Sequence, residues 1–252
     1  MPRLINDDPT MQQHQIGGGN FTFQGTRIES LGATEYTLVT IAIDETGSTD
    51  GFQDALRQAL VTAVKACKKS PRSDNILIRV IKFSSALPGG IEEIHGFKPL
   101  SEINPDDYEQ FSPGGLTPLC DAAYSAVGAM LAYAKQLTDA DFYVNGIVFV
   151  ATDGDDNRSV STPRMIKEET EKAVTGEAIE SLVTILIGIN ASQYAAELAD
   201  FQKQAGFTQY IDASDATAGK LAKLAEFVSQ SVSSQSQALG TGGPSQSIAT
   251  TF

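Results

Sequence analysis

The chain is poor in cysteine, histidine and positive charge. It has 2 cysteines and 2 histidines among 252 residues, so no disulfide framework is expected, and reduced, buried thiols are the expected state. Its 18 Lys and Arg residues face 31 Asp and Glu residues, which gives a formal net charge of -13 at pH 7. Nucleic acids and anionic lipid surfaces would be repelled by that charge, so neither is expected as a partner.

Long apolar runs and several functional motifs are also missing. No stretch approaches the roughly 18 to 20 apolar residues of a membrane span, and the segment Met1–Pro9 carries acids and prolines where a secretory signal needs an apolar region. The chain has neither a Gly-x-x-x-x-Gly-Lys phosphate loop nor a Gly-x-Ser-x-Gly elbow. Neither His14 nor His95 has the context of a catalytic base. These absences predict a cytoplasmic protein that is not embedded in a membrane.

Apolar runs that alternate with amphipathic segments indicate the fold class. The expected strands are mostly continuous in Val, Ile and Leu, and the main ones cover Tyr36–Ile43, Asn75–Ser84, Gly146–Thr152 and Ser181–Ile189. This pattern predicts an α/β fold in which a doubly wound, mostly parallel sheet is flanked by helices on both faces. The short run Ile91–Ile94 is expected to add one antiparallel edge strand.

The length is that of one α/β domain of ordinary to large size. Residues 1–20 are rich in Gln, Asp, Pro and Gly and are expected to form a flexible arm. Residues 21–232 form the single predicted domain. The tail 233–252 is dominated by Ser, Gln, Gly and Thr, so it is expected to be disordered or to bind back on the domain or on a partner. Its removal is expected to leave a folded domain.

Five oxygen-bearing residues follow two of the expected strands or lie in a glycine-flanked loop. Asp44, Thr46 and Ser48 come at alternate positions after the first apolar strand, and Asp153 ends another. Thr117 lies in the loop Gly-Gly-Leu-Thr-Pro-Leu between them. Ligands of such sheets gather at the carboxyl ends of the strands. Hard oxygen donors of these types suit Mg²⁺, with Mn²⁺ or Ca²⁺ as alternatives.

Each of these residues has a simpler reading when it is taken alone. Asp44 could be only a helix N-cap, and Asp153-Gly154 is a common turn. The match of five residues in type, order and loop context favours a metal site over these readings. Five protein oxygens leave one coordination position that water would otherwise fill. A carboxylate from a partner protein is expected to take that position, which would make the site a metal-gated docking point.

The pattern Asp-x-Thr-x-Ser, then Thr-Pro in a glycine-flanked loop, then Thr-Asp-Gly resembles the von Willebrand factor A family and its metal-ion-dependent adhesion site. The resemblance covers roughly Tyr36 to Ser231 and implies that the five residues above are the metal ligands. Thr46 stands where the family more often has Ser, and it keeps the hydroxyl. The Thr117 loop looks most like prokaryotic intracellular members of the tellurite-resistance-associated type. That resemblance implies a bacterial adaptor or scaffold in a stress response.

The alternative is a Mg²⁺-dependent phosphotransfer enzyme of the haloacid-dehalogenase type, because those enzymes also place an Asp at the tip of a parallel strand beside a metal. Their nucleophile motif resembles Asp-x-Asp, whereas this chain has Asp44-Glu45-Thr46. A hydroxyl replaces the carboxylate that would act as acid and base. The sequence therefore favours a non-enzymatic binding module.

Overall fold

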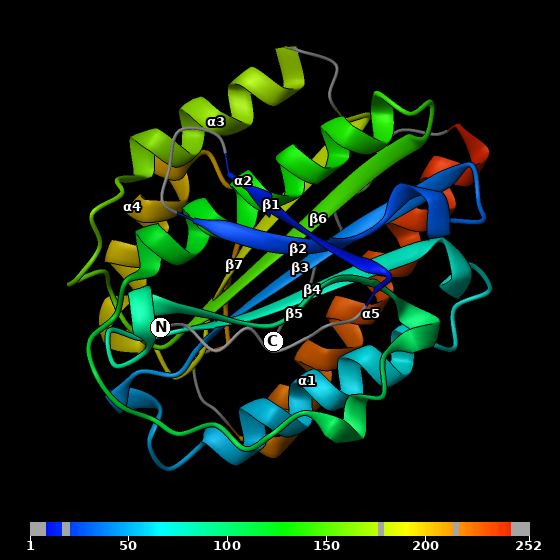
Figure 1. Ribbon diagram of the computed structural model, residues 1–252. Helices are drawn as coiled ribbons and strands as arrows, with labels where there is room; N and C mark the ends of the chain where they lie inside the picture. The colour runs from blue at the N-terminus through cyan, green and yellow to red at the C-terminus, as the bar shows by residue number, and fades with distance from the viewer. Residues whose placement is uncertain (1–8, 17–20, 176–178, 214–216, 243–252) are drawn as a thin grey trace.

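The computed structural model describes residues 9–16, 21–175, 179–213 and 217–242. Within these residues an eight-stranded sheet has the order β1-β2-β5-β4-β3-β6-β7-β8, and it crosses the middle of the molecule in Figure 1. The strands are β1 Met11–Gln15, β2 Thr22–Thr26, β3 Glu35–Asp44, β4 Ile76–Phe83, β5 Ile91–Pro99, β6 Tyr143–Thr152, β7 Ser181–Gly188 and β8 Gln209–Asp212.

Helices cover both faces of this sheet. They are α1 Gln53–Cys67, α2 Leu119–Thr138, α3 Pro163–Thr175, α4 Ala195–Ala205 and α5 Ala218–Thr241. Helices α1 and α5 lie on one face, and α2, α3 and α4 lie on the other (Figure 1). In the described part of the chain, none of the helices combines the length and the apolar character needed to cross a membrane.

Each face of the sheet builds its own core. In β3, Leu38 belongs to the apolar cluster under α2, whereas Val39 and Ile41 belong to the cluster under α1 and α5. Successive side chains of a strand point to opposite faces, so a strand covered on both sides must be apolar throughout. This explains the continuous apolar runs and confirms the predicted α/β architecture with flanking helices.

The sheet is more mixed than the sequence predicted. Strands β3, β4, β6, β7 and β8 pair in parallel, and β5 is antiparallel to β4. Strand β5 is not at the edge, however, because β2 pairs with it in parallel and β1 pairs antiparallel with β2. Gly96 permits the close approach of β2, since a Cβ there would lie 2.1 Å from the carbonyl oxygen of Gln24. A single antiparallel edge strand is therefore an incomplete description.

Part of the expected N-terminal arm is ordered as β1. Met11 is buried and Ile16 is fully buried, and the backbone N–H of Ile16 donates to the carbonyl of Phe21. Two apolar anchors and a strand partner thus outweigh the polar composition that predicted flexibility. The rest of the arm, residues 1–8 and 17–20, lies outside the described residues.

The expected tail is part of the domain as far as residue 242, because α5 continues to Thr241. Gln235 and Ser236 are fully buried. The side-chain amide of Asn145 donates to the carbonyl oxygen of Gln235 at 2.7 Å and accepts from the Thr37 hydroxyl at 2.7 Å. Residues 233–241 thus pack on the domain as the last part of α5. Residues 243–252 lie outside the described part.

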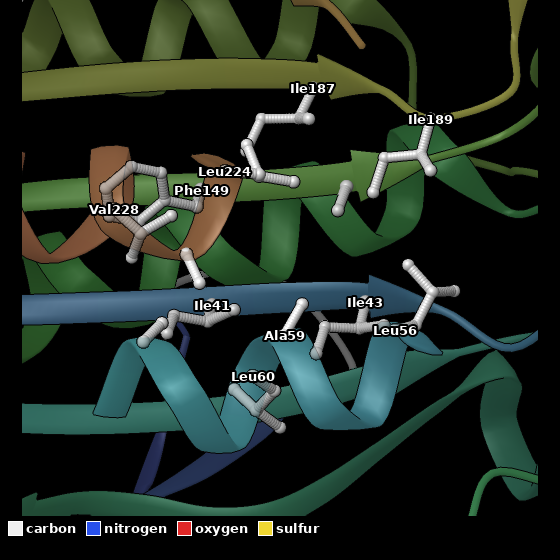
Figure 2. A pocket seen from close by; sticks show the side chains of 13 residues that line it. Ile41, Ile43, Leu56, Ala59, Leu60, Phe149, Ile187, Ile189, Leu224 and Val228 are labelled. Carbon is white, nitrogen blue, oxygen red and sulfur yellow. The ribbon is translucent and has the colours of Figure 1, made fainter. Parts of the chain in front are cut away.

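The rest of α5 is held by apolar packing. Figure 2 shows aliphatic and aromatic side chains from α1, α5, β3, β6 and β7 that surround a small space between the helices and the sheet. They are Ile41, Ile43, Leu56, Ala59, Leu60, Ala63, Phe149, Ala151, Ile187, Ile189, Leu224, Ala225 and Val228. Apolar contacts have little directionality, so the hydrogen bonds around Asn145 fix where the far end of α5 lies.

This arrangement predicts that deleting residues 233–252 destabilises the domain. The deletion removes the acceptor of the buried Asn145 amide, and a buried polar group without a partner costs about 1–3 kcal/mol. The free energy of unfolding from urea titration should fall by at least that amount. Deleting residues 243–252 leaves every described contact in place and is the matched control.

A double-mutant cycle separates this contact from a general effect of shortening the chain. Asn145→Ala should cost less in the truncated protein than in the full-length protein, because its partner has already been lost. Equal costs in the two backgrounds would contradict an anchoring role for Asn145.

Candidate metal centre

The parallel pairing of β3 with β6 brings two carboxylates to one edge of the sheet. The strands pair in register up to Ile43 with Ala151, so Asp44 ends one strand as Asp153 follows the other. Asp44 is 2% exposed and Asp153 is 5% exposed. The sequence predicted that the two residues converge, and the structure shows that both are buried.

Asp44 is held in a fixed orientation. Its Oδ1 accepts from the backbone N–H of Thr46 at 2.8 Å, and its Oδ2 accepts from the Thr152 hydroxyl at 2.7 Å. The backbone N–H of Gly154 donates to the Thr152 hydroxyl oxygen at 3.2 Å. Sequence reasoning gave Thr152 no role, although its position directly before Asp153 was the available signal.

Thr46 and Ser48, the two predicted ligands that follow Asp44, lie between the two carboxylates and hydrogen-bond to them or to each other. The hydroxyl oxygens of Thr46 and Ser48 lie 3.0 Å apart, and the Ser48 hydroxyl donates to Oδ1 of Asp153 at 2.7 Å. Thr46 is buried and Ser48 is exposed. A hydroxyl that donates its hydrogen still offers lone pairs to a cation. Both hydroxyls can therefore coordinate a metal and keep their places.

Thr117 reaches the same edge from the loop that precedes α2. This loop is fastened to the Asp44 loop by two backbone hydrogen bonds, from Gly47 to the Gly115 carbonyl at 3.2 Å and from Gly114 to the Glu45 carbonyl at 3.1 Å. Gly115 has φ +74°, and a Cβ there would lie 2.6 Å from the backbone nitrogen of Ala86. Glycine is required at this position for both reasons.

The Thr117 side chain is buried beside the end of β6. A Cβ added at Gly154 would lie 3.8 Å from its hydroxyl oxygen. Asn157 fixes the Thr117 backbone from both sides, because its Oδ1 accepts from the Thr117 N–H at 2.8 Å and its own N–H donates to the Thr117 carbonyl at 3.1 Å. All five predicted residues thus lie around one site.

Two neighbouring acidic residues have structural roles. Asp156 accepts from the backbone N–H of Cys120 at 2.7 Å, which ties its loop to the start of α2. Glu45 is buried, pairs with Lys82 at 3.2 Å and accepts from the backbone N–H of Ser112 at 2.6 Å. These contacts join segments that are distant in sequence, so they arise only in the folded chain.

The electrostatics of the site favour a cation. Burial raises the pKa of Asp44 to about 6, and the nearby Asp153 carboxylate adds to that rise, against the opposing hydrogen bonds from Thr46 and Thr152. Burial also raises the pKa of Asp153. Two carboxylates that lose water and repel each other are stabilised by a positive charge between them.

The donor set is one of oxygens alone. Among the described residues, no group of three or more His, Cys, Asp or Glu side chains is placed to hold a metal ion, so any ion at this site depends on the two carboxylates together with the hydroxyls. The cleft beside them has no Lys, Arg or His in its lining. It is formed by Ser48, Gly115, Leu116, Thr117, Asp153, Gly154, Asp155, Asp156, Asn157, Asn190, Gln193 and Tyr194. The residues present fit a hard divalent cation.

Comparison of the sequence with models of protein families and with curated protein sequences gives no match. The fold, in contrast, is similar to solved structures. The PilB minor pilin from Streptococcus sanguinis has a TM-score of 0.56 at 15% identity, over 87% of this chain and 66% of that chain. The pilus adhesin SpaC from Lactobacillus rhamnosus GG has a TM-score of 0.60 at 10% identity, over 89% of this chain and 32% of that chain.

A third similar structure is proximal thread matrix protein 1 from the mussel byssus with a zinc-occupied MIDAS motif. Its TM-score is 0.50 at 15% identity, over 79% of this chain and 46% of that chain. The present chain thus spans two thirds or less of the length of each of these proteins. At such identities the likeness concerns the fold alone, and a fold of the von Willebrand factor A type is what the sequence resemblance implied.

The prediction of a cytoplasmic protein is wrong. The solved structures similar to this chain include a minor pilin and a pilus adhesin, which are proteins of pili and not of the cytoplasm. The prediction rested on what the N-terminus and the cysteine content lack, and such absences do not specify a compartment.

The raised pKa of Asp44 predicts how stability depends on pH when a chelator is present. Its folded-state pKa is about 6 and lies above the ordinary value of 3.8, so the stability it contributes is present below the ordinary value and is lost as pH rises through 6. In chelator, deprotonation of this group should lower the melting temperature between roughly pH 4 and pH 6. Excess Mg²⁺ should remove most of that fall.

Asp44→Asn is the matched variant, because an amide can accept from the Thr46 N–H and donate to the Thr152 hydroxyl oxygen. It should flatten the pH dependence in chelator and abolish the effect of Mg²⁺. Thermal unfolding followed by circular dichroism measures both, and an unchanged pH slope in the variant would contradict the assignment.

Proposed function

We propose that this chain is a metal-dependent protein-binding domain with a MIDAS-type site. The proposed ligands of Mg²⁺, with Mn²⁺ or Ca²⁺ as alternatives, are Asp44, Thr46, Ser48, Thr117 and Asp153. The observation that carries the proposal is the meeting of two buried carboxylates and three hydroxyls at one sheet edge, beside a cleft whose lining has no basic side chain. The oxygen donors support a hard cation.

The geometry supports docking as the use of such an ion. The loops around the site are fixed by hydrogen bonds, and Ser48 is exposed, so the proposed ligand set reaches the protein surface. A bound divalent cation would supply a positive point on an acidic surface. A carboxylate from a partner protein is the group that we propose to bind there, since Mg²⁺ favours carboxylate oxygens.

The net charge of -13 supports a protein as the partner in place of nucleic acid or an anionic membrane. We also propose that the chain is not an enzyme. Glu45, the residue after Asp44, is engaged with Lys82 and Ser112, and Thr46 supplies no second carboxylate for phosphotransfer.

The setting that we propose is a surface assembly. The similar minor pilin and pilus adhesin support this setting, in which metal-dependent capture of a carboxylate would hold two proteins together. The narrower resemblance to tellurite-resistance-associated members stays a prediction. It no longer supports a role as a cytoplasmic adaptor or scaffold.

The proposal predicts the metal affinities of matched variants. Mg²⁺ binding should weaken by at least about tenfold in each of the variants Asp44→Asn, Asp153→Asn, Ser48→Ala and Thr117→Ala. Mutation of a residue that only hydrogen-bonds to a metal ligand already has an effect of about this size, so the loss of a ligand itself should have at least the same effect. Asp50→Asn is the control, since Asp50 is an exposed carboxylate close to Ser48 in the chain and outside the proposed ligand set. Isothermal titration calorimetry measures the affinities.

Two results would overturn the proposal. One is Mg²⁺ affinity that depends no more on Asp44 and Asp153 than on Asp50. The other is metal-dependent hydrolysis of a generic phosphoester that Asp44→Asn abolishes, because that result would show an enzyme of the phosphotransfer type.

A further inference from the structure

Two exposed apolar side chains line the cleft beside the candidate metal centre. Among the described residues, the large apolar side chains that are exposed are Leu116, Tyr143, Val160, Met165 and Tyr194. Two of these, Leu116 at 51% exposure and Tyr194 at 36%, line the same cleft as Asp153. They come from different loops, one before α2 and the other after β7.

Leu116 is displayed from a fixed backbone. Its N–H donates to the Ser85 hydroxyl at 2.7 Å, and its carbonyl accepts from the Ser85 N–H at 2.9 Å. The next residue is Thr117, one of the proposed ligands. An apolar side chain whose backbone is already ordered loses less entropy when it contacts a partner, so Leu116 is suited to recognition.

Tyr194 lies beside Gly154 at the same cleft. A Cβ added at Gly154 would lie 3.9 Å from Cε2 of the Tyr194 ring and 3.8 Å from the Thr117 hydroxyl oxygen. The ring and a proposed ligand therefore border the same residue, which directly follows Asp153. The turn before Tyr194 is set by Asn190, which has φ +56° and also lines the cleft.

The charges of the cleft restrict what else a partner can present. Its lining contains Asp153, Asp155 and Asp156 and no basic side chain. The metal would compensate Asp153, whereas Asp155 and Asp156 would still repel additional acidic groups of a partner. A ligand with a single carboxylate is therefore favoured over an acidic run.

We propose that the partner is a protein segment in which one Glu or Asp has an apolar side chain beside it and no second acidic residue nearby. Leu116 and Tyr194 are the specificity-determining residues for this segment. The inference rests on the proposed metal-dependent function and adds the chemical class of the ligand. Two such contacts make selection measurable, because each buried apolar side chain changes affinity by about tenfold or more.

The test uses short synthetic peptides with the full-length chain in Mg²⁺. One peptide has a central Glu flanked by Leu in a Gly and Ser background, and a second has Ser in place of both Leu residues. A third carries Gln in place of Glu, and a fourth adds a second Glu beside the flanking Leu. Fluorescence anisotropy of labelled peptides measures each affinity.

The wild-type chain should bind the Leu-flanked peptide at least about tenfold more tightly than the Ser-flanked peptide. The second Glu should weaken binding. Leu116→Ser and Tyr194→Ala should each reduce the preference for Leu, whereas Tyr194→Phe should keep it because the ring remains. Tyr143→Ser is the matched control, since Tyr143 is 62% exposed and lies at the opposite end of β6.

The outcomes separate this inference from the function on which it rests. One outcome is equal affinity for the Leu-flanked and Ser-flanked peptides, together with loss of binding in chelator and for the Gln peptide. That outcome overturns the inference and keeps the metal-dependent function. Binding that survives both chelator and Gln, or no binding by any peptide, overturns both. In calorimetry with Mg²⁺ alone, Leu116→Ser should bind the ion with the affinity of the wild-type chain. A loss of that affinity would show that Leu116 has a structural role and not a recognition role.

Discussion

The register between β3 and β6 is the constraint on which the rest of the site depends. The two strands pair without a shift from Glu35 with Tyr143 to Ile43 with Ala151, so their carboxyl ends stop side by side. The Thr152 hydroxyl can then donate to Asp44 at 2.7 Å. A slip of one residue would turn every side chain to the opposite face of the sheet. Because both faces of β3 are packed with apolar side chains, the two cores that stabilise the fold also fix the geometry of the metal centre.

The same packing buries the Asp44 carboxylate, and a bound cation would compensate its negative charge. Asp44 follows a run of buried residues and is itself 2% exposed, so it loses the solvation that an ionised carboxylate has in water. Hydrogen bonds from Thr46 and Thr152 oppose this loss. Burial has the larger effect, so the pKa of Asp44 is raised. The site is thus held ready by the fold at a cost in stability, which is a common property of sites that bind a ligand.

The sequence predicts features that local residue patterns determine, and it does not predict contacts between distant segments. The five site residues could be brought together because strand ends of a parallel sheet share an edge, and their metal role stays a proposal. The hydrogen bonds of Asn157 with Thr117 could not be predicted, since they form between loops that are distant in sequence. The apolar run Ile91–Ile94 shows a strand but not all its neighbours, so the pairing of β2 with β5 and of β1 with β2 could not be predicted. The buried Gln235 was missed because its polar side chain gave no sign that the segment packs against Asn145.

The loops that supply the proposed ligands also supply the apolar contacts of the cleft. Thr117 directly follows Leu116, and Asp153 directly precedes Gly154, against which the Tyr194 ring lies. Hydrogen bonds join these loops to one another, from Gly47 to Gly115 and between Thr117 and Asn157. A displacement of either loop would therefore move a proposed metal ligand and a proposed partner contact together. The proposed ligands and contacts belong to one arrangement of hydrogen-bonded loops, so a bound ion and the apolar side chains would act on a bound segment as a single surface.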